Sequence, residues 1–430
     1  MSEAGYPKGP IGSLIAGQIG GGTPSRQNPT YWAGQIPWAS VKDFAKGDTE
    51  LRTTEERISQ QGLQASATNL IPANTPIVCT RMAVGRVAIA PIDVAINQDL
   101  KALTPGRGIS TRYLLRLADY AKAKAEAVSV GSTVKGIKIS DYLNISVPLA
   151  PAPSQPKIAE VLDTLDAAIR GTEAVVAKLR AMKQGLLHDL LTRGIDANGD
   201  LRPPQHEAPH LYKQTPLGWL PKEWDVLEVQ DLLAPVDPSM RSGPFGSALL
   251  KEELVSEGIP FLGIDNVHVE RFDRDYKRFV TYGKFLQLRR YAVRPDDLMI
   301  TIMGTVGRCC LVPSDVGDAL SSKHTWTISV DRAKYSPYLA MLQVNYSDWV
   351  LRHFSKDQQG GTMSAIRSET IRTAMLPAPP RPEQADIEAI LMEHSNRLRE
   401  EAALLDKLRL QKSGLMDDLL TGRVTVTPLL

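Results

Sequence analysis

A stripe of apolar side chains with helical spacing occurs twice in the chain. In residues 158–192 the apolar side chains recur every three or four positions, which is the pattern of one helix face. Residues 387–421 repeat this pattern without a gap at a constant shift of 229 positions, and neither copy contains an interior proline. A helix of about 37 residues is roughly 55 Å long, which is longer than most globular cores need. The pattern therefore predicts two long helices that pack against each other as an antiparallel coiled coil.

The contact between these helices is expected to use the apolar members of the stripe. They are Ile158, Leu162, Leu165, Ile169, Leu179 and Leu186 in the first helix, and Ile387, Leu391, Leu398, Leu408 and Leu415 in the second. The charged positions between them, such as Lys178 and Arg399, are expected to form solvated flanks of the coiled coil or a platform for partner subunits.

Each long helix follows a block of short apolar runs broken by Gly, Pro, Asn and Asp, which is typical of strands and turns. The second block repeats the first. Residues 71–91 align with 293–313 at a shift of 222, which pairs Gly85 with Gly307, and residues 131–150 align with 360–379 at the shift of the helices. Because the order is domain, helix, domain, helix, the duplication predicts pseudo-two-fold symmetry with one domain at each end of the helix pair.

The resulting fold class is α+β, with two mixed domains of helices and strands separated by the long helices. The expected segments are a first domain at 1–153, a helix at 154–193, a linker at 194–215, a second domain at 216–380, a helix at 381–422 and a tail at 423–430. The alanine-rich residues 114–128 are compatible with a surface helix. The second domain opens with Trp219 and Trp224, whereas the first has no tryptophan there, so we expect the first domain to be trimmed or locally different at its start.

Composition restricts the class of protein. The 430 residues are 43% apolar and 23% charged, as in a soluble globular protein of two to four domains. The net charge is only +2, so any nucleic-acid contact must come from local patches. The cysteines Cys79, Cys309 and Cys310 fit neither a disulfide framework nor zinc-ligand spacing, which favours the reducing cytoplasm. No apolar run reaches the length of a membrane span, and residues 1–10 lack the order of a signal peptide.

Catalytic motifs are missing from the sequence. The glycine-rich residues 17–22 have no following Lys-Ser/Thr for a phosphate loop, and no His-Glu-x-x-His is present. We therefore expect a protein that is not an enzyme. The rival hypothesis, a methyltransferase or nuclease that reads its own site, would need a strand-glycine-helix cofactor motif or a carboxylate metal cluster.

Polar loops that contain glycine recur at matching places in the two blocks. Arg can read guanine, Asn and Gln can read adenine, and Lys, Ser and Thr can hold phosphates. Taken singly each signal is weak, because an arginine is more often solvated surface and a tryptophan is as often core as interface. The residues expected to contact DNA are Thr23, Ser25, Arg26, Tyr31, Trp32, Lys42, Arg86, Thr133 and Lys135 in the first domain, and Arg241, Ser242, Phe245, Asn266, Lys284, Arg308, Lys323, His324, Gln358, Gln359 and Thr362 in the second.

Several stretches resemble the specificity (S) subunit of type I restriction–modification systems, and the resemblance covers nearly the whole chain. They are the helix ends GLLHDLLT at residues 185–192 and GLMDDLLT at 414–421, the loops GGTPSR at 21–26 and SGPFGS at 242–247, and PLGWLPKEW at 216–224. The resemblance implies two target-recognition domains, each reading one half of a split, asymmetric site on double-stranded DNA. It also implies that the helices fix the gap and dock two methyltransferase (M) subunits, which restriction (R) subunits join.

The same resemblance implies that catalysis, S-adenosylmethionine, ATP and Mg belong to the partner subunits, with no cofactor in this chain. The alternative from another class is a coiled-coil scaffold with two protein-binding heads and no DNA specificity. The two hypotheses differ in the salt dependence of binding to duplex DNA, which is steep only where side chains neutralise phosphates.

Overall fold

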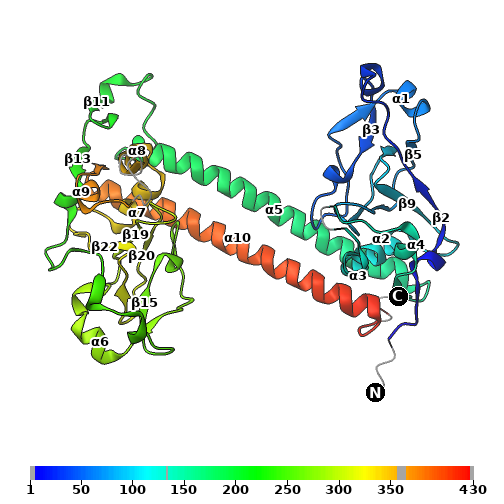
Figure 1. Ribbon diagram of the computed structural model, residues 1–430. Helices are drawn as coiled ribbons and strands as arrows, with labels where there is room; N and C mark the ends of the chain where they lie inside the picture. The colour runs from blue at the N-terminus through cyan, green and yellow to red at the C-terminus, as the bar shows by residue number, and fades with distance from the viewer. Residues whose placement is uncertain (1–4, 132–133, 356–364, 427–430) are drawn as a thin grey trace. The chain divides into compact units, whose positions relative to one another are not determined.

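The structure is a computed structural model, described here for residues 5–131, 134–355 and 365–426 (Figure 1). The chain divides into two compact units. Unit 1 comprises residues 1–175 and 401–430, and unit 2 comprises residues 176–400. The division falls inside the two long helices, α5 (Ser154–Thr192, 39 residues) and α10 (Arg381–Thr421, 41 residues). Each unit therefore contains one domain of mixed strands and helices together with a part of both long helices.

The domain of unit 1 is built on two four-stranded sheets. Their strand orders are β2-β9-β6-β7 and β4-β3-β8-β5, and only the pair β3 and β8 is parallel among their described pairings. The strands are β1 (Lys8–Pro10), β2 (Ile15–Gly20), β3 (Ile36–Ala39), β4 (Glu56–Ile58), β5 (Asn69–Ile71), β6 (Ile77–Cys79), β7 (Val87–Ala88), β8 (Val94–Ile96), β9 (Leu100–Pro105) and β10 (Ser146–Pro148). The short helices are α1 (Gln60–Gln64), α2 (Thr111–Tyr120), α3 (Lys122–Val128) and α4 (Ile139–Leu143).

The domain of unit 2 repeats this topology. The sheet β14-β22-β19-β20 corresponds to β2-β9-β6-β7, and in β18-β15-β21 the pair β15 and β21 is again parallel. The pair β13 and β23 corresponds to β1 and β10. The strands are β11 (Tyr212–Thr215), β12 (Gly218–Pro221), β13 (Asp225–Glu228), β14 (Met240–Arg241), β15 (Ile259–Leu262), β16 (Val267–His268), β17 (Arg271–Phe272), β18 (Phe279–Val280), β19 (Leu298–Thr301), β20 (Cys309–Leu311), β21 (Leu320–Ser321), β22 (Thr325–Ile328) and β23 (Met375–Ala378). The short helices are α6 (Tyr282–Gln287), α7 (Pro337–Tyr346), α8 (Asp348–Ser355) and α9 (Ser368–Arg372).

The alignment of Gly85 with Gly307 read from the sequence is confirmed. Both glycines have a left-handed backbone, with φ of 77° and 86°, which a residue without a Cβ adopts at little cost. Gly85 donates its N–H to the carbonyl of Cys79, and Gly307 donates to that of Thr301, at 2.9 and 2.8 Å. The same tight turn thus joins β6 to the edge strand β7 in unit 1 and β19 to the edge strand β20 in unit 2.

The alanine-rich stretch 114–128 is not a surface helix throughout. It forms two helices, and the first, α2, lies in the core of unit 1 with Leu114, Leu115 and Leu117 fully buried. Only Ala125 is buried in α3, which follows it. The large apolar side chains of α2 decide its position, and the alanines that suggested a surface helix belong mainly to α3.

The long helices belong to the cores of both units. In unit 1, Ile158 and Leu162 of α5 share a core with Leu419 and Leu420 of α10. In unit 2, the core includes Leu187 and Leu190 of α5 and Ile387 and Leu391 of α10. Every stripe residue expected in the helix contact is buried or partly buried. Within unit 1 the two helix parts run antiparallel, because Glu173 pairs with Arg409 while Asp166 pairs with Lys412.

Residues 194–215, read from the sequence as a linker, are a packed part of unit 2. Arg202 donates from Nη2 to Glu383 Oε2 at 3.0 Å, and the same carboxylate accepts from Trp224 Nε1 at 3.0 Å. Ile195 is buried beside them. In unit 1 the strand register places Tyr6 where unit 2 has Trp224, and the Tyr6 N–H bonds the carbonyl of Thr421 at 2.8 Å. Among the described residues, no helix is both long and apolar enough to cross a membrane.

Candidate nucleic-acid interface

A hollow of about 240 Å³ in unit 1 brings three of the predicted DNA-contacting residues together. Thr23 and Arg26 come from the loop after β2, Lys42 comes from the turn after β3, and the three meet there. Its wall is formed by the loop after β2, the turn after β3, the start of β4 and the loop between β8 and β9. The full lining is Thr23, Arg26, Trp38, Ser40, Val41, Lys42, Glu56, Met82, Asn97, Gln98 and Asp99.

Aromatic stacking and an ion pair position Arg26. Its guanidinium carbon lies 3.6 Å from the centre of the Trp32 ring, and Trp32 meets Trp38 edge-on at 5.0 Å. Its Nη2 donates to Glu56 Oε2 at 2.8 Å, and Nη1 donates to Oε1. This bidentate hydrogen bond holds the pKa of Glu56 below its usual range, and Lys42 adds a smaller effect of the same sign. The hollow therefore presents an ionised carboxylate beside two cations.

Several residues of this hollow were missed in the sequence, including Glu56, Asn97 and Gln98. Gln98 accepts a hydrogen bond from Thr23 Oγ1 at 2.6 Å, and Asn97 lies beside it in the loop between β8 and β9. The matching loop of unit 2 contains Lys323 and His324, which the sequence did single out. The correspondence was hidden because the strand register relates these loops by a shift of 225, whereas the sequence alignment used 222 and 229.

The other predicted residues of the first domain lie outside this wall. Ser25, Tyr31 and Trp32 belong to the loop that supports Arg26, and the Ser25 carbonyl accepts from Trp32 Nε1 at 3.2 Å. Lys135 is exposed, and its carbonyl bonds the N–H of Met82. Arg86 donates to the carbonyl of Phe44 at 2.7 Å, so it binds its own domain. Thr133, Gln358, Gln359 and Thr362 lie outside the described residues.

The equivalent loops of unit 2, beside the parallel strands β15 and β21, carry different side chains. Arg278 forms an ion pair with Asp265, and Ser242 Oγ lies 3.4 Å from the carbonyl of Lys323. His324 contacts Met303 through Nδ1 and Sδ at 3.2 Å. Burial lowers the pKa of His324, and the positive charges of Lys323 and Arg278 lower it further, so this imidazole is neutral at pH 7.

Three further predicted residues of unit 2 are near the surface. Phe245 is 57% exposed. Lys284 pairs with Glu253 at 2.7 Å, which uses its charge inside the domain. Arg308 follows Gly307 and is half-buried.

Arg241 and Asn266 support the fold of unit 2. Arg241 is 3% exposed, forms an ion pair with Asp297 and donates from Nε to the carbonyl of Ala292 at 2.7 Å. Asn266 is 1% exposed, and its Oδ1 accepts from the N–H of Gly263 at 2.9 Å. Asp43 caps the matching turn of unit 1 in the same way. Both side chains are therefore bound inside unit 2, and we do not propose them as DNA contacts.

The sequence is similar to those of known specificity subunits. Residues 11–180 match the family model of the type I restriction modification DNA specificity domain. The EcoR124I/EcoR124II specificity subunit of Escherichia coli is 30% identical over 175 residues, which cover 37% of this chain and 42% of that protein. The MjaIX specificity subunit of Methanocaldococcus jannaschii is 27% identical over 223 residues, which cover 50% and 48%. The chain thus spans less than half the length of either of these relatives.

Solved structures share the fold over nearly the whole length. The crystal structure of the S subunit of a type I restriction–modification system from M. genitalium aligns with a TM-score of 0.63 at 14% identity, covering 98% of this chain and 97% of that one. A chain from a structural study of complex assembly and conformational transition in the type I system aligns with a TM-score of 0.50 at 14% identity, covering 99% and 100%. The resemblance read from the sequence is confirmed: residues 11–180 match the DNA specificity domain of type I restriction–modification systems, and the relatives that this chain is similar to are specificity subunits.

Proposed function

We propose that this chain is the DNA-recognition subunit of a type I restriction–modification complex in the cytoplasm, and that each of its two domains reads one half of a bipartite, asymmetric site. The proposal rests on the loops beside the parallel strand pairs β3–β8 and β15–β21, which recur in both domains. Both domains share the order of one four-stranded sheet and the parallel strand pair of a second sheet. The loops beside that pair nevertheless present Arg26, Lys42 and Gln98 in unit 1 and Arg278, Lys323 and His324 in unit 2. A shared backbone arrangement with different polar side chains is what two domains would need to read two different half-sites.

The long helices supply the second part of the proposal. Continuous helices of 39 and 41 residues are each roughly 60 Å long. We propose that they set the distance between the half-sites and dock two M subunits, which R subunits join. Methyl transfer and DNA cleavage, with S-adenosylmethionine, ATP and Mg, then belong to those partners.

Binding to DNA at several salt concentrations tests recognition itself. The purified chain with its M subunits is mixed with a duplex carrying the methylated motif and with a random duplex. We expect tight binding to the first, and weaker binding to both as salt rises, because phosphate contacts release counterions. Binding that ignores both the sequence and the salt would favour the scaffold with two protein-binding heads.

Insertion of one heptad into both helices tests the spacing. Seven residues lengthen a helix by about 10 Å, which corresponds to about three base pairs at 3.4 Å each. Sequencing of methylated sites in a host that carries the variant should show the same half-sites with a longer spacer. Functional methylation with the original spacer would contradict this part of the proposal. A variant with seven substitutions on the exposed face of each helix, and no insertion, is the control.

A further inference from the structure

We propose that two matched positions, one on a strand and one on a turn, determine which base each domain prefers. In unit 1 they hold Glu56 and Lys42, and in unit 2 they hold Arg278 and Asp265, so the signs of the charges are exchanged. This inference rests on the proposed function and names residues that carry its specificity.

The strand register establishes the strand position. Trp38 of β3 is paired with Glu56 of the antiparallel strand β4 and with Ala95 of the parallel strand β8. In unit 2, Phe261 of β15 is paired with Leu320 of the parallel strand β21. Its N–H donates to the carbonyl of Arg278 at 2.8 Å. Glu56 and Arg278 therefore occupy equivalent places beside the central parallel pair of strands.

The turn that follows the central strand establishes the second position. In unit 1 the turn is Val41–Asp43, and Asp43 Oδ2 accepts from the N–H of Ser40 at 2.7 Å. In unit 2 it is Ile264–Asn266, closed by the matching bond from Gly263 to Asn266 at 2.9 Å. Because the two turns are capped in the same way, their middle residues Lys42 and Asp265 occupy equivalent positions.

Glu56, the first residue of β4, and Arg278, immediately before β18, each keep hydrogen-bonding capacity for a ligand. The side chains of Glu56 and Arg278 are 37% and 36% exposed. A carboxylate has about four lone-pair sites, and Arg26 uses two of those on Glu56. Arg278 donates from Nη2 to Asp265, and its buried Nε has no partner. Both side chains are held by a charged neighbour that leaves part of the group open.

The chemistry of the two groups then differs toward bases. A carboxylate accepts from an exocyclic amino group, as on cytosine N4, whereas a guanidinium donates to the paired acceptors O6 and N7 of guanine. Lys42 and Asp265 reinforce the difference, since each places at the turn the charge opposite to that on the strand. The strand position of unit 1 is thereby suited to a base that offers an amino group, and that of unit 2 to guanine.

Two neutral variants test the inference in the full complex with M subunits, and the first of them is isosteric with the wild-type residue. Glu56→Gln retains a hydrogen bond to Arg26, and Arg278→Gln removes the guanidinium. Methylated sites are sequenced in hosts that carry each variant. We expect Glu56→Gln to relax one position of one half-site, with roughly tenfold weaker discrimination between the preferred base and its competitor, while the other half-site and the spacer stay unchanged. Arg278→Gln should relax the opposite half-site only, so each variant is the control for the other.

The outcomes separate this inference from the proposed function. If the wild-type complex shows no bipartite methylation motif, the proposed function fails. If it shows one, and both variants methylate it with unaltered base preference, the strand position does not determine specificity and the inference is overturned. Lys42→Asp is a third variant on an exposed turn. It should alter the same half-site as Glu56→Gln, and it keeps the test decisive if either strand variant fails to fold.

Discussion

Helices α2 and α7 carry different side chains at one equivalent position beside the long helices. α2 and α7 occupy equivalent places, since the N–H groups of their caps, Ser110 and Ser336, bond Gln155 and Gln384 of the long helices at 3.1 and 2.9 Å. Six residues beyond each cap stand Arg116 in unit 1 and Leu342 in unit 2, and both are buried. This position, called the joint, is therefore charged in unit 1 and apolar in unit 2. Helix α7 and its cap also donate hydrogen bonds to α10, from Ser336 to Glu388 and from Tyr338 to Ser395.

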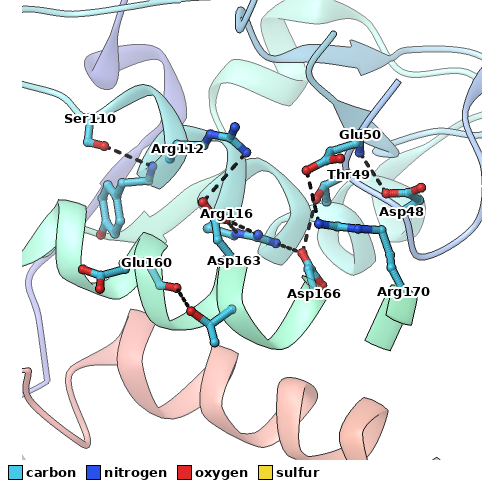
Figure 2. A network of polar contacts seen from close by, with 12 residues as sticks. Asp48, Thr49, Glu50, Ser110, Arg112, Arg116, Glu160, Asp163, Asp166 and Arg170 are labelled. Atoms are coloured by element: carbon cyan, nitrogen blue, oxygen red, sulfur yellow. Dashed lines mark hydrogen bonds and ion pairs between the residues drawn. The ribbon is translucent and has the colours of Figure 1, made fainter. Parts of the chain in front are cut away.

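The charged joint of unit 1 is a network centred on Asp166 (Figure 2). Arg116 forms ion pairs with Asp163 and Asp166 of α5. Lys412 of α10 reaches Asp166 at 2.6 Å, and Thr49 lies 3.4 Å from it. The network thus connects the domain and the parts of both long helices that belong to unit 1. The constant helix shift places Met392 and Ser395 of unit 2 where unit 1 has the two aspartates.

The largest expected effect comes from removing the buried arginine alone. Arg116→Leu introduces the residue of unit 2 but leaves Asp163 and Asp166 without their main partner. Breaking a buried ion pair from one side costs about 3–5 kcal/mol, so the free energy of unfolding of unit 1 should fall by that amount. Unfolding in urea is followed by hydrogen exchange of backbone amides. The amides of α2 report the stability of unit 1, and those of α7 report the stability of unit 2 in the same sample. A loss below about 1 kcal/mol, or equal loosening of both helices, would show that the network does not stabilise unit 1.

A smaller effect is expected from two matched lysines. Lys412 and Lys183 are equivalent in the helix repeat, but Lys412 pairs with Asp166 of a helix and Lys183 pairs with Glu270 of its domain at 2.6 Å. Lys412→Met should destabilise unit 1 by about 1–3 kcal/mol. Lys183→Met should destabilise unit 2 by less, because Glu270 still accepts from the hydroxyl of Tyr346. The same exchange measurement compares them, and a larger cost for Lys183→Met would reverse the comparison.

Replacing the network as a whole should cost less than breaking it. The triple variant Arg116→Leu, Asp163→Met and Asp166→Ser installs all three residues of unit 2. Arg116→Leu and Asp163→Met exchange an ion pair for apolar groups, which is often neutral or stabilising. Asp166→Ser leaves a neutral hydroxyl, and Lys412 can extend its ammonium to water. We expect a stability within about 1 kcal/mol of the wild type, far above that of Arg116→Leu. Equal stability of the triple and single variants would mean that the apolar joint needs other features of unit 2.

The sequence revealed the features that repeat and missed those that differ between the halves. The stripe containing Leu162 and Leu391 was visible because burial repeats every three or four residues in a helix. Arg116 was read as part of a surface helix, since its partners lie 47 and 50 residues away in the chain. Arg241 was taken as a DNA contact from the chemistry of its loop, yet its partner is 56 residues away. Charge pairing across such separations depends on strand and helix register, which periodicity does not encode.

The smallest expected effect is a pH dependence that separates the charged joint from the apolar one. Burial alone would raise the pKa of Asp166, but Arg116 and Lys412 outweigh it, so the pKa is lowered. A lowered pKa contributes stability that is present above the unfolded value of about 3.9 and is lost as pH falls through the folded value. The wild type should therefore lose stability relative to the triple variant only below about pH 4, while carboxylates common to both cancel. Urea unfolding of both proteins at pH 7, 5, 4 and 3.5 measures the difference, and a gap that stays constant into acid would show that protonation of Asp166 does not weaken the joint.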